Sequence, residues 1–465
     1  MMIAMPQGMA NNLPDLGEAS REHFSEKQER DIARSIMRDI HASPSYLADA
    51  ETEAYLNGLG RRLAAESSAS GRSFTFFAMR EPSVNAFALP GGYIGVHTGL
   101  IQAAESESEL AGVLAHEIAH VSQEHLSRMI AQQDRNYLPT LAAIAVAVLA
   151  ARSNANVGSA ALATGQALSL QSQLNFTREN EREADRVGLD ILAGAGFDPR
   201  GMSGFFGRLQ RANRLYDNNA PEYLRTHPLN SQRIADIDGR LERMSYKQVR
   251  DSREFHFVRA RLVALDGSAD EAVARLRDQV QNRKTPLEAA SRYGLALALM
   301  RQNKFAEAEK ELALAAKAGE SAMLLNLRAE LKARAGDSRQ ALSLYQSALS
   351  RHPQHLPLVY GYGDALIRAG QAQKAADFIS RQSRQRPDDA RLWRLLGRAH
   401  AALGHRLASH RAEAEAFAAQ GNLTAAVEQV SLGLKAGDGD FYELSAAEAR
   451  RREWQESLAA ESRKK

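Results

Sequence analysis

Residues 113–121, VLAHEIAHV, place two histidines and a glutamate inside an otherwise apolar segment. On a helix, residues four apart lie on one face, so His116 and His120 can each turn a ring nitrogen toward a single ion. Glu117 projects beside them, where it can take a proton from an attacking water and pass it to a leaving amine. The apolar neighbours predict a buried helix, in which polar groups without a shared task would be costly. The stretch therefore predicts a zinc-dependent hydrolytic site, and the alternative is two histidines that find hydrogen bonds in an ordinary core.

Tetrahedral zinc with an open position requires a third protein ligand. The chain has no cysteine, so every ligand must offer nitrogen or oxygen. His125 is the nearest candidate, but the metzincin pattern requires Gly and His at 123 and 126, where this chain has Gln123 and Leu126. Membership of that family is therefore not expected.

A better candidate for the third ligand lies in residues 176–192, FTRENEREADRVGLDIL, whose apolar positions predict a helix. Glu181 and Asp185 lie four apart on one face, where like charges repel unless a cation or a donor meets them. Zinc on Glu181, with Asp185 bonded to a ligand histidine, would relieve that repulsion. Glu179 and Glu183 form the same four-residue pair, so periodicity does not choose between the pairs, and a solvated charged helix stays the alternative.

Residues 73–101 precede the apolar helix and are rich in β-favouring side chains, with turn residues at 81–82 and 90–92. They predict a small antiparallel sheet of about three strands. An exposed sheet edge offers unpaired backbone groups to an extended peptide. The candidate substrate-binding residues are Asn85, Ala86 and Phe87.

Beyond residue 250 the pattern is helical almost throughout, and it repeats. Gly336, Gly370 and Gly404 are spaced 34 residues apart, and Pro353 and Pro387 keep the same step. This period is that of tetratricopeptide repeats, which form solenoids that bind many unrelated ligands. A plain helical bundle is the alternative.

The length of 465 residues suggests two or three domains. We expect an extended or disordered segment at 1–21, an α+β zincin-type metallopeptidase domain at 22–250, mainly helical with the small sheet, and an all-α tetratricopeptide solenoid at 251–465. The net charge of +3 comes from interleaved acidic and basic residues, so nucleic acid is not an expected partner. The first 20 residues contain no intact secretory signal.

The most apolar run, residues 138–151, is too short to span a membrane. We interpret it as a buried helix. The alternatives are a mobile lid beside the active site and a peripheral membrane contact.

In combination, HEIAH, TRENEREADRVG and RTHPLNSQRI resemble the HtpX and CAAX-prenyl-protease type of zinc metallopeptidase. With a tetratricopeptide tail and no membrane spans, the chain is most similar to the periplasmic BepA-like subgroup. The stretch NAFALPGGYIGVHTGLI also matches the sheet that precedes the active helix in this family, so the resemblance covers nearly the whole chain. One departure is Thr177, where the family usually has Ser.

The resemblance implies a role for each matching residue. His116, His120 and Glu181 would hold one zinc ion per chain, Glu117 would be the general base, and Asp185 would support a ligand histidine. His227 and Arg233 match the His-Pro segment of the family and could stabilise the oxyanion of the tetrahedral intermediate. Alternatively, His227 could occupy the open position on zinc as a fourth ligand and hold the enzyme latent.

The implied function is a zinc endopeptidase of the periplasm, with chaperone-like activity, in the quality control of misassembled outer-membrane β-barrel proteins. Its partners would be unfolded or misassembled substrates and the outer-membrane assembly machinery. A second interpretation is a solenoid adaptor or chaperone whose peptidase is mostly latent. A third, a membrane-bound or prenyl-processing peptidase, is disfavoured because spans are missing.

Overall fold

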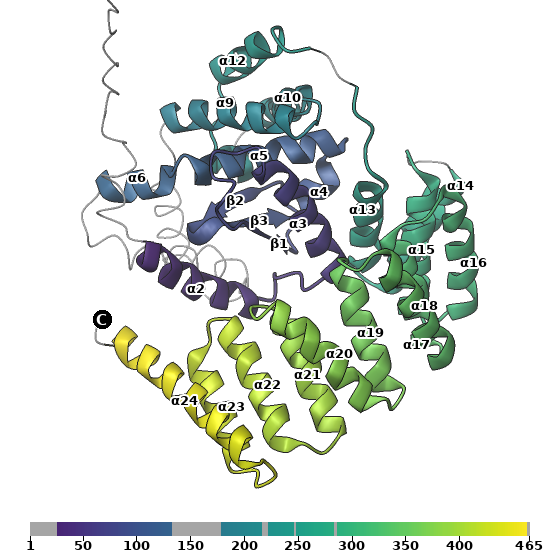
Figure 1. Cartoon of the computed structure of the whole chain (residues 1–465). Helices are drawn as coiled ribbons and strands as arrows, with labels where there is room; N and C mark the ends of the chain where they lie inside the picture. The colour runs from purple at the N-terminus through teal and green to yellow at the C-terminus, as the bar shows by residue number, and fades with distance from the viewer. Residues whose placement is uncertain (1–25, 133–177, 216–221, 246–247, 283–285, 463–465) are drawn as a thin grey trace, which may run out of the picture.

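The computed structural model describes residues 26–132, 178–215, 222–245, 248–282 and 286–462. Figure 1 shows two parts: the helices labelled α2 to α12 surround a small sheet, and α13 to α24 form a curved array of paired helices beside and below it. The segments 1–21 and 138–151 lie outside the described residues. Within the described ranges, no helix combines the length and the apolar character that a membrane span requires.

The sheet has three strands in the order β1-β3-β2, formed by β1 (Thr75–Met79), β2 (Ala86–Leu89) and β3 (Tyr93–His97). β2 and β3 are antiparallel and joined by the tight turn η1 (Pro90–Gly92), in which Gly91 has a φ of 79°. β1 and β3 are parallel. The expectation of an antiparallel sheet is therefore wrong for one of the two pairings: the sheet is mixed, because β2 takes the far edge and β3 lies between it and β1. Side chains alternate in the same way in both directions, so the residue pattern could not show this.

Helix α5 (Glu107–Ser122) carries the HEIAH sequence and lies inside the first part. The Ser106 hydroxyl caps it by accepting a hydrogen bond from the Glu109 amide, and acidic residues in the first turn suit the positive end of the helix. All residues from 107 to 121 are buried. The neighbours that cover α5 include α3 (Ala50–Ala64), α9 (Arg178–Gly194) and α10 (Arg200–Leu215).

Close approach of α9 to α5 depends on a glycine. A Cβ atom added to Gly188 would lie 3.1 Å from the Cα and N atoms of His116, so only a residue without a side chain lets the two backbones meet here. The acidic face of α9 is thereby brought against the histidines of α5. The first part is completed by α2 (Glu26–Ala42), α4 (Thr98–Ala103), α6 (His125–Gln132), α11 (Glu222–Thr226) and α12 (Ser231–Leu241).

The repeated glycines of the second part end helices. Gly336, Gly370 and Gly404 follow α17, α19 and α21 with φ of 89°, 71° and 78°. Glycine adopts this left-handed conformation without strain, so the 34-residue period marks the C-terminal caps of successive helices. The array consists of α13 (Arg253–Leu265), α14 (Ala269–Gln281), α15 (Glu288–Arg301), α16 (Phe305–Ala315), η3 (Ala316–Ala318), α17 (Ala322–Arg334), α18 (Ser338–Arg351), α19 (Leu356–Arg368), α20 (Ala372–Gln385), α21 (Ala390–Ala402), α22 (Arg406–Ala419), α23 (Leu423–Leu434) and α24 (Phe441–Ser462).

Buried polar contacts join the two parts at a junction beside α3. Arg261 on α13 donates to both carboxylate oxygens of Asp49, at 2.6 to 3.0 Å. Glu51 accepts a hydrogen bond from Asn326 at 2.7 Å and lies 2.9 Å from Nε2 of His355. One hydrophobic core also continues from the first part into α13 to α17. The expected boundary at residues 250 and 251 falls between α12 and α13 but does not separate two cores.

Candidate metal centre

Four buried side chains converge between α5, α9 and the segment after α11. One ligand atom from each of His116, His120, Glu181 and His227 lies within 4.8 Å of the other three. The Nε2 atoms of His116 and His120 are 3.0 Å apart. Oε1 of Glu181 lies 3.3 Å from Nε2 of His120 and 3.0 Å from Nδ1 of His227. Three imidazole nitrogens and a carboxylate form a donor set that suits a transition-metal ion.

Asp185 and Arg233 hold this cluster from behind. Oδ1 of Asp185 lies 3.1 Å from Nδ1 of His116, so the opposite ring nitrogen faces the cluster. Arg233, only 1% exposed, donates to both oxygens of Asp185 at 2.7 Å and lies 2.8 Å from Oε2 of Glu181. Burial disfavours its charge, but Asp185 and Glu181 outweigh this effect and raise the pKa of Arg233. Its guanidinium is thus engaged with two carboxylates.

The charges of the cluster favour a cation. Burial lowers the pKa of His116, but Asp185 and Glu181 outweigh it and raise the pKa to about 9. Burial raises the pKa of Glu181, yet His227 and the two α5 histidines outweigh it and hold the pKa well below its usual range. Burial lowers the pKa of His120, which keeps this ring neutral. Glu181 is thus ionised and His120 is neutral, and the environment of His116 stabilises positive charge. These are the conditions under which a divalent metal binds.

Glu117 lies beside the cluster, and its carboxylate has no hydrogen-bond partner among the described residues. It is fully buried. The nearest ring nitrogen is Nε2 of His227, 3.5 Å from Oε1. Burial raises the pKa of Glu117, although His227 and His116 oppose the shift. A carboxylate of this kind is suited to accept and release a proton.

His227 is held in the cluster by the segment around it. Its ring stacks on Tyr223, with centroids 4.7 Å apart, and its amide donates to the Tyr223 carbonyl. The Tyr223 amide in turn donates to the carbonyl of Val84, next to β2. The segment carrying His227 is therefore attached to the sheet beside the histidines.

β2 is an edge strand and lies against α5. The backbone amide of Ala88 lowers the pKa of Glu117 against the larger effect of burial, although it makes no hydrogen bond of ordinary geometry with either carboxylate oxygen. Asn85 and Ala86 are buried, and the Asn85 carbonyl accepts a hydrogen bond from the His97 amide. Phe87 is half-buried and pairs with Gly95. The strand at which substrate binding was predicted thus lies beside the helix of Glu117, but the Asn85 carbonyl is already bonded within the protein.

The acidic residues of α9 divide between two faces. Glu181 and Asp185 face the histidines, whereas Glu179 is exposed. Glu183 lies 3.0 Å from Nε2 of His125, a fully buried residue that contacts His120. Burial lowers the pKa of His125 to about 4, so its ring is neutral. Sequence reasoning set His125 aside because it considered the residue only as a direct ligand.

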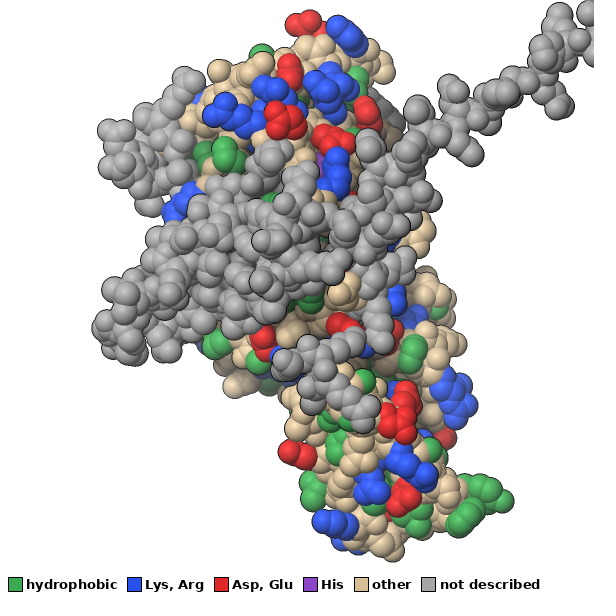
Figure 2. All heavy atoms as spheres, turned by 90° about the vertical axis from the view of Figure 1, so that its left-hand side faces the viewer, with side chains coloured by type: hydrophobic (Ala, Val, Ile, Leu, Met, Phe, Trp, Pro, Cys, Tyr) green, Lys and Arg blue, Asp and Glu red, His purple; other side chains and the backbone are tan. Residues whose placement is uncertain are grey.

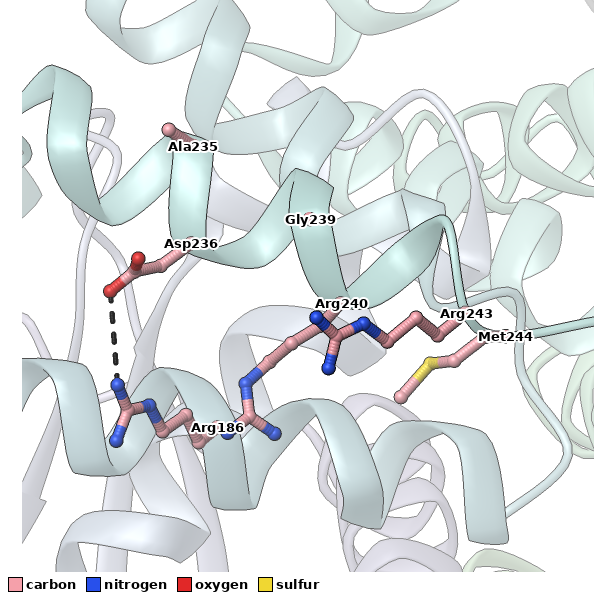
Figure 3. A pocket seen from close by; sticks show the side chains of 7 residues that line it. All are labelled: Arg186, Ala235, Asp236, Gly239, Arg240, Arg243 and Met244. Carbon is pink, nitrogen blue, oxygen red and sulfur yellow. Dashed lines mark ion pairs between the residues drawn. The ribbon is translucent and has the colours of Figure 1, made fainter.

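A pocket of about 440 Å³ lies near the metal cluster but outside it, between α9 and α12 (Figure 3). Arg186, Arg240 and Arg243 line it, and Arg186 is 3.9 Å from Asp236. None of the four cluster residues contributes to its wall. In Figure 2, basic and acidic side chains are interspersed on the parts of this face where described residues are visible, in agreement with the mixed charge of the sequence.

Known proteins resemble this chain in both of its parts. Peptidase family M48 matches residues 50–241, and tetratricopeptide repeats match residues 266–322 and 332–399. The chain is 33% identical over 425 residues to the beta-barrel assembly-enhancing protease of Escherichia coli O157:H7, covering 91% of this chain and 87% of that protein. The protein of the same name from Yersinia pestis is 31% identical over 421 residues, with 90% and 86% covered. Mitochondrial metalloendopeptidase OMA1 of Schizosaccharomyces pombe is 30% identical over 217 residues, which cover 46% of this chain and 60% of that protein.

Proposed function

Because the chain belongs to the M48 metallopeptidases, in the family of the beta-barrel assembly-enhancing proteases, we propose that it is a zinc endopeptidase that cleaves misassembled envelope proteins. The observation that carries this proposal is the buried cluster of three histidines and a glutamate with Glu117 beside it. The domain limits proposed are 22–250 for the peptidase and 251–465 for the solenoid.

The zinc ligands proposed are His116, His120 and Glu181. They supply nitrogen and oxygen donors, as zinc accepts in peptidases that keep one position open. Asp185 fixes the orientation of His116 through Nδ1, and Arg233 fixes Asp185 in turn. We therefore assign Arg233 mainly to positioning the carboxylates, with stabilisation of the oxyanion as a further role to be tested.

Zinc, when bound, would polarise the scissile carbonyl and the attacking water. Glu117 would take the proton of that water, since its carboxylate is buried and accepts no other hydrogen bond. It would then pass the proton to the amine that leaves. An extended substrate segment would pair with the edge of β2, at Asn85, Ala86 and Phe87, which brings the peptide bond next to Glu117.

His227 has two roles open to it, and the geometry favours the latch. Its Nδ1 is 3.0 Å from Glu181 and 3.4 Å from Nε2 of His116, so it is placed among the ligands as a fourth donor. In that position it would fill the place of the attacking water and keep the peptidase latent. If the segment after α11 moved, the same ring could donate a hydrogen bond to the oxyanion.

The solenoid is proposed to recruit protein clients. A pocket of about 500 Å³ opens where α17, α19 and α21 approach the start of α3, and arginine and tyrosine side chains line much of it. Asn326 lies in its wall, 8% exposed, and its amide oxygen has no partner among the described residues. By analogy with the relatives named for β-barrel assembly, we propose outer-membrane β-barrel proteins and their assembly machinery as partners, and the periplasm as the compartment.

The same pocket supports a second candidate function, that of an adaptor or chaperone whose peptidase is mainly latent. The two functions differ in their need for Glu117. Glu117→Gln would be expressed in cells that lack the protein. If it restored outer-membrane assembly to the same extent as wild type, the result would support the adaptor function.

The test of the peptidase proposal compares wild type, Glu117→Gln and His227→Ala for bound zinc and for cleavage of casein. We expect about one zinc per chain in all three and no cleavage by Glu117→Gln. Faster cleavage by His227→Ala would support the latch, whereas retained zinc with lost cleavage would make His227 catalytic. If no variant bound metal, the zinc peptidase proposal would fail.

A further inference from the structure

The proposed ligand His120 has a second polar contact on the side away from the metal cluster. Its Nδ1 lies 2.8 Å from Nδ1 of His125, which is 0% exposed. Nε2 of His125 lies 3.0 Å from Oε2 of Glu183, and Arg128 donates to that same oxygen at 2.9 Å. A line of polar groups thus leads from the cluster to the half-exposed side chain of Glu183 on α9.

The backbone is shaped to make this contact. Five residues along an uninterrupted helix correspond to a turn of about 140° between side chains, so His125 could not face His120 on a continued α5. Instead α5 ends at Ser122, and Glu124 adopts a φ of 52° before α6 begins at His125. This left-handed conformation is unfavourable for a residue with a side chain, and such strain is found where a functional arrangement demands it.

The positions of the protons follow from the contacts. A distance of 2.8 Å between two ring nitrogens requires one proton between them, with one ring donating and the other accepting. Nε2 of His120 faces the cluster, 3.0 Å from His116, and must offer its lone pair to a metal. The proton of His120 is therefore on Nδ1 and is donated to His125. The proton of His125 is then on Nε2, where it is donated to Glu183.

We propose that His125 and Glu183 are positioning residues, which fix the tautomer and the orientation of His120 for metal binding. This proposal rests on the proposed zinc centre. Asp185 does the same for His116, so each histidine ligand on α5 has a partner at Nδ1. The two partners differ, because His116 meets a carboxylate directly and His120 meets one through an intervening imidazole.

The test measures the affinity of the full-length chain for Zn²⁺ by competition with a chromophoric chelator at neutral pH. His125→Leu keeps an apolar side chain in the core but removes the acceptor, and we expect binding about 10- to 100-fold weaker. His125→Asn retains an oxygen near the position of Nδ1 and should recover most of that loss. Glu183→Ala should weaken binding by about tenfold, at the lower end of that range. Glu179→Ala, at an exposed position on the same helix, is the matched control and should bind as wild type does.

Three results would overturn the proposal. Unchanged affinity for Zn²⁺ in both His125→Leu and Glu183→Ala would show that this line of hydrogen bonds does not contribute to metal binding. An equal or greater loss in His125→Asn than in His125→Leu would show that the residue acts by packing. Since Glu183 is half-exposed, Glu183→Ala tests the line even if the His125 variants fail to fold. Wild type without affinity for Zn²⁺ would overturn the zinc centre and this proposal together, whereas the first two results leave the zinc centre standing.

Discussion

The junction between the two parts buries a carboxylate that is fully bonded, whereas the metal centre also contains one, that of Glu117, that is buried without a hydrogen-bond partner among the described residues. At the junction, Asp49 is 8% exposed and accepts hydrogen bonds from Arg261 and from the amide and hydroxyl of Thr52. In the metal centre, Glu117 is 0% exposed and accepts none from the described residues. An unpartnered buried charge is costly, so it persists where a reaction uses it, whereas a fully bonded pair can hold two elements together.

The pKa values of the two carboxylates move in opposite directions because their partners differ. Burial raises the pKa of both. At Asp49 the charge and hydrogen bonds of Arg261 outweigh burial and lower the pKa, whereas at Glu117 burial exceeds the effect of His227 and the pKa rises. A buried carboxylate therefore indicates a reactive site when its partners are missing.

The largest effect expected is on catalysis. Glu117→Gln should lower the rate of peptide cleavage by about 10²- to 10⁴-fold, because the general base is lost. It should not lower the melting temperature, since an amide is less costly to bury unpaired than a carboxylate. Cleavage rate, zinc content and thermal unfolding are measured on the same preparation. A clear drop in melting temperature would mean that Glu117 also stabilises the fold, and the contrast with Asp49 would fail.

At the junction we expect a loss of stability instead of a loss of activity. Asp49→Asn leaves the guanidinium of Arg261, 11% exposed, buried without its charged partner, and should reduce the free energy of unfolding by about 3 kcal/mol. Denaturant unfolding of the full-length chain measures the change. The control is Asp266→Asn, which breaks an exposed pair with Arg275 and should change stability by about 0.5 kcal/mol or less. If both variants lost the same amount, the junction pair would carry no special stability.

The junction pair should also contribute to acid sensitivity. The pKa of Asp49 is lowered in the folded chain, below the value of about 3.9 of an unfolded aspartate. Its contribution to stability is therefore present above about pH 4 and disappears as the pH falls through the folded pKa. The difference in unfolding free energy between wild type and Asp49→Asn should be largest at neutral pH and shrink below about pH 4. A difference that stayed constant on acidification would contradict the assignment.

Local spacing predicted the parts of the site that lie within one helix. The four-residue interval of HEIAH was enough to pair His116 with His120, and their ligand atoms do converge with Glu181 and His227. Spacing could not choose Glu181 over Glu183, because both are one turn from another acid. The choice depends on which face of α9 meets α5, and that is decided by tertiary packing at Gly188.

Contacts between distant segments had no signal in the sequence. Asp49 and Arg261 are 212 residues apart, and each looks like an ordinary surface charge. The parallel pairing of β1 with β3 was hidden because alternation does not reveal strand direction. His125 was considered in the sequence only as a direct ligand. Its contact with His120 depends on the left-handed Glu124, and no residue pattern indicates that turn.

The smallest change that we expect to affect the metal centre is the addition of a single methyl group at Gly188. In Gly188→Ala the added Cβ would meet the backbone of His116 and Ala115 at 3.1 to 3.2 Å, and backbone cannot move aside as a flexible side chain does. Helix α9 must therefore shift from α5, at a cost of about 1–3 kcal/mol of stability. That shift carries Glu181 and Asp185 away from the histidines, so Zn²⁺ affinity should fall as well.

Gly58→Ala on α3 is the matched control for this substitution, because its added Cβ meets nothing within 4 Å. It should stabilise the chain by about 0.5–1 kcal/mol through helix propensity and leave zinc binding unchanged. Unfolding and chelator competition on both variants measure the two effects. If Gly188→Ala lost stability but bound Zn²⁺ as wild type does, the contact between α5 and α9 would serve packing alone. The geometry of the metal centre would then depend on Arg233, which holds Asp185 and Glu181 of α9 from the side of α12.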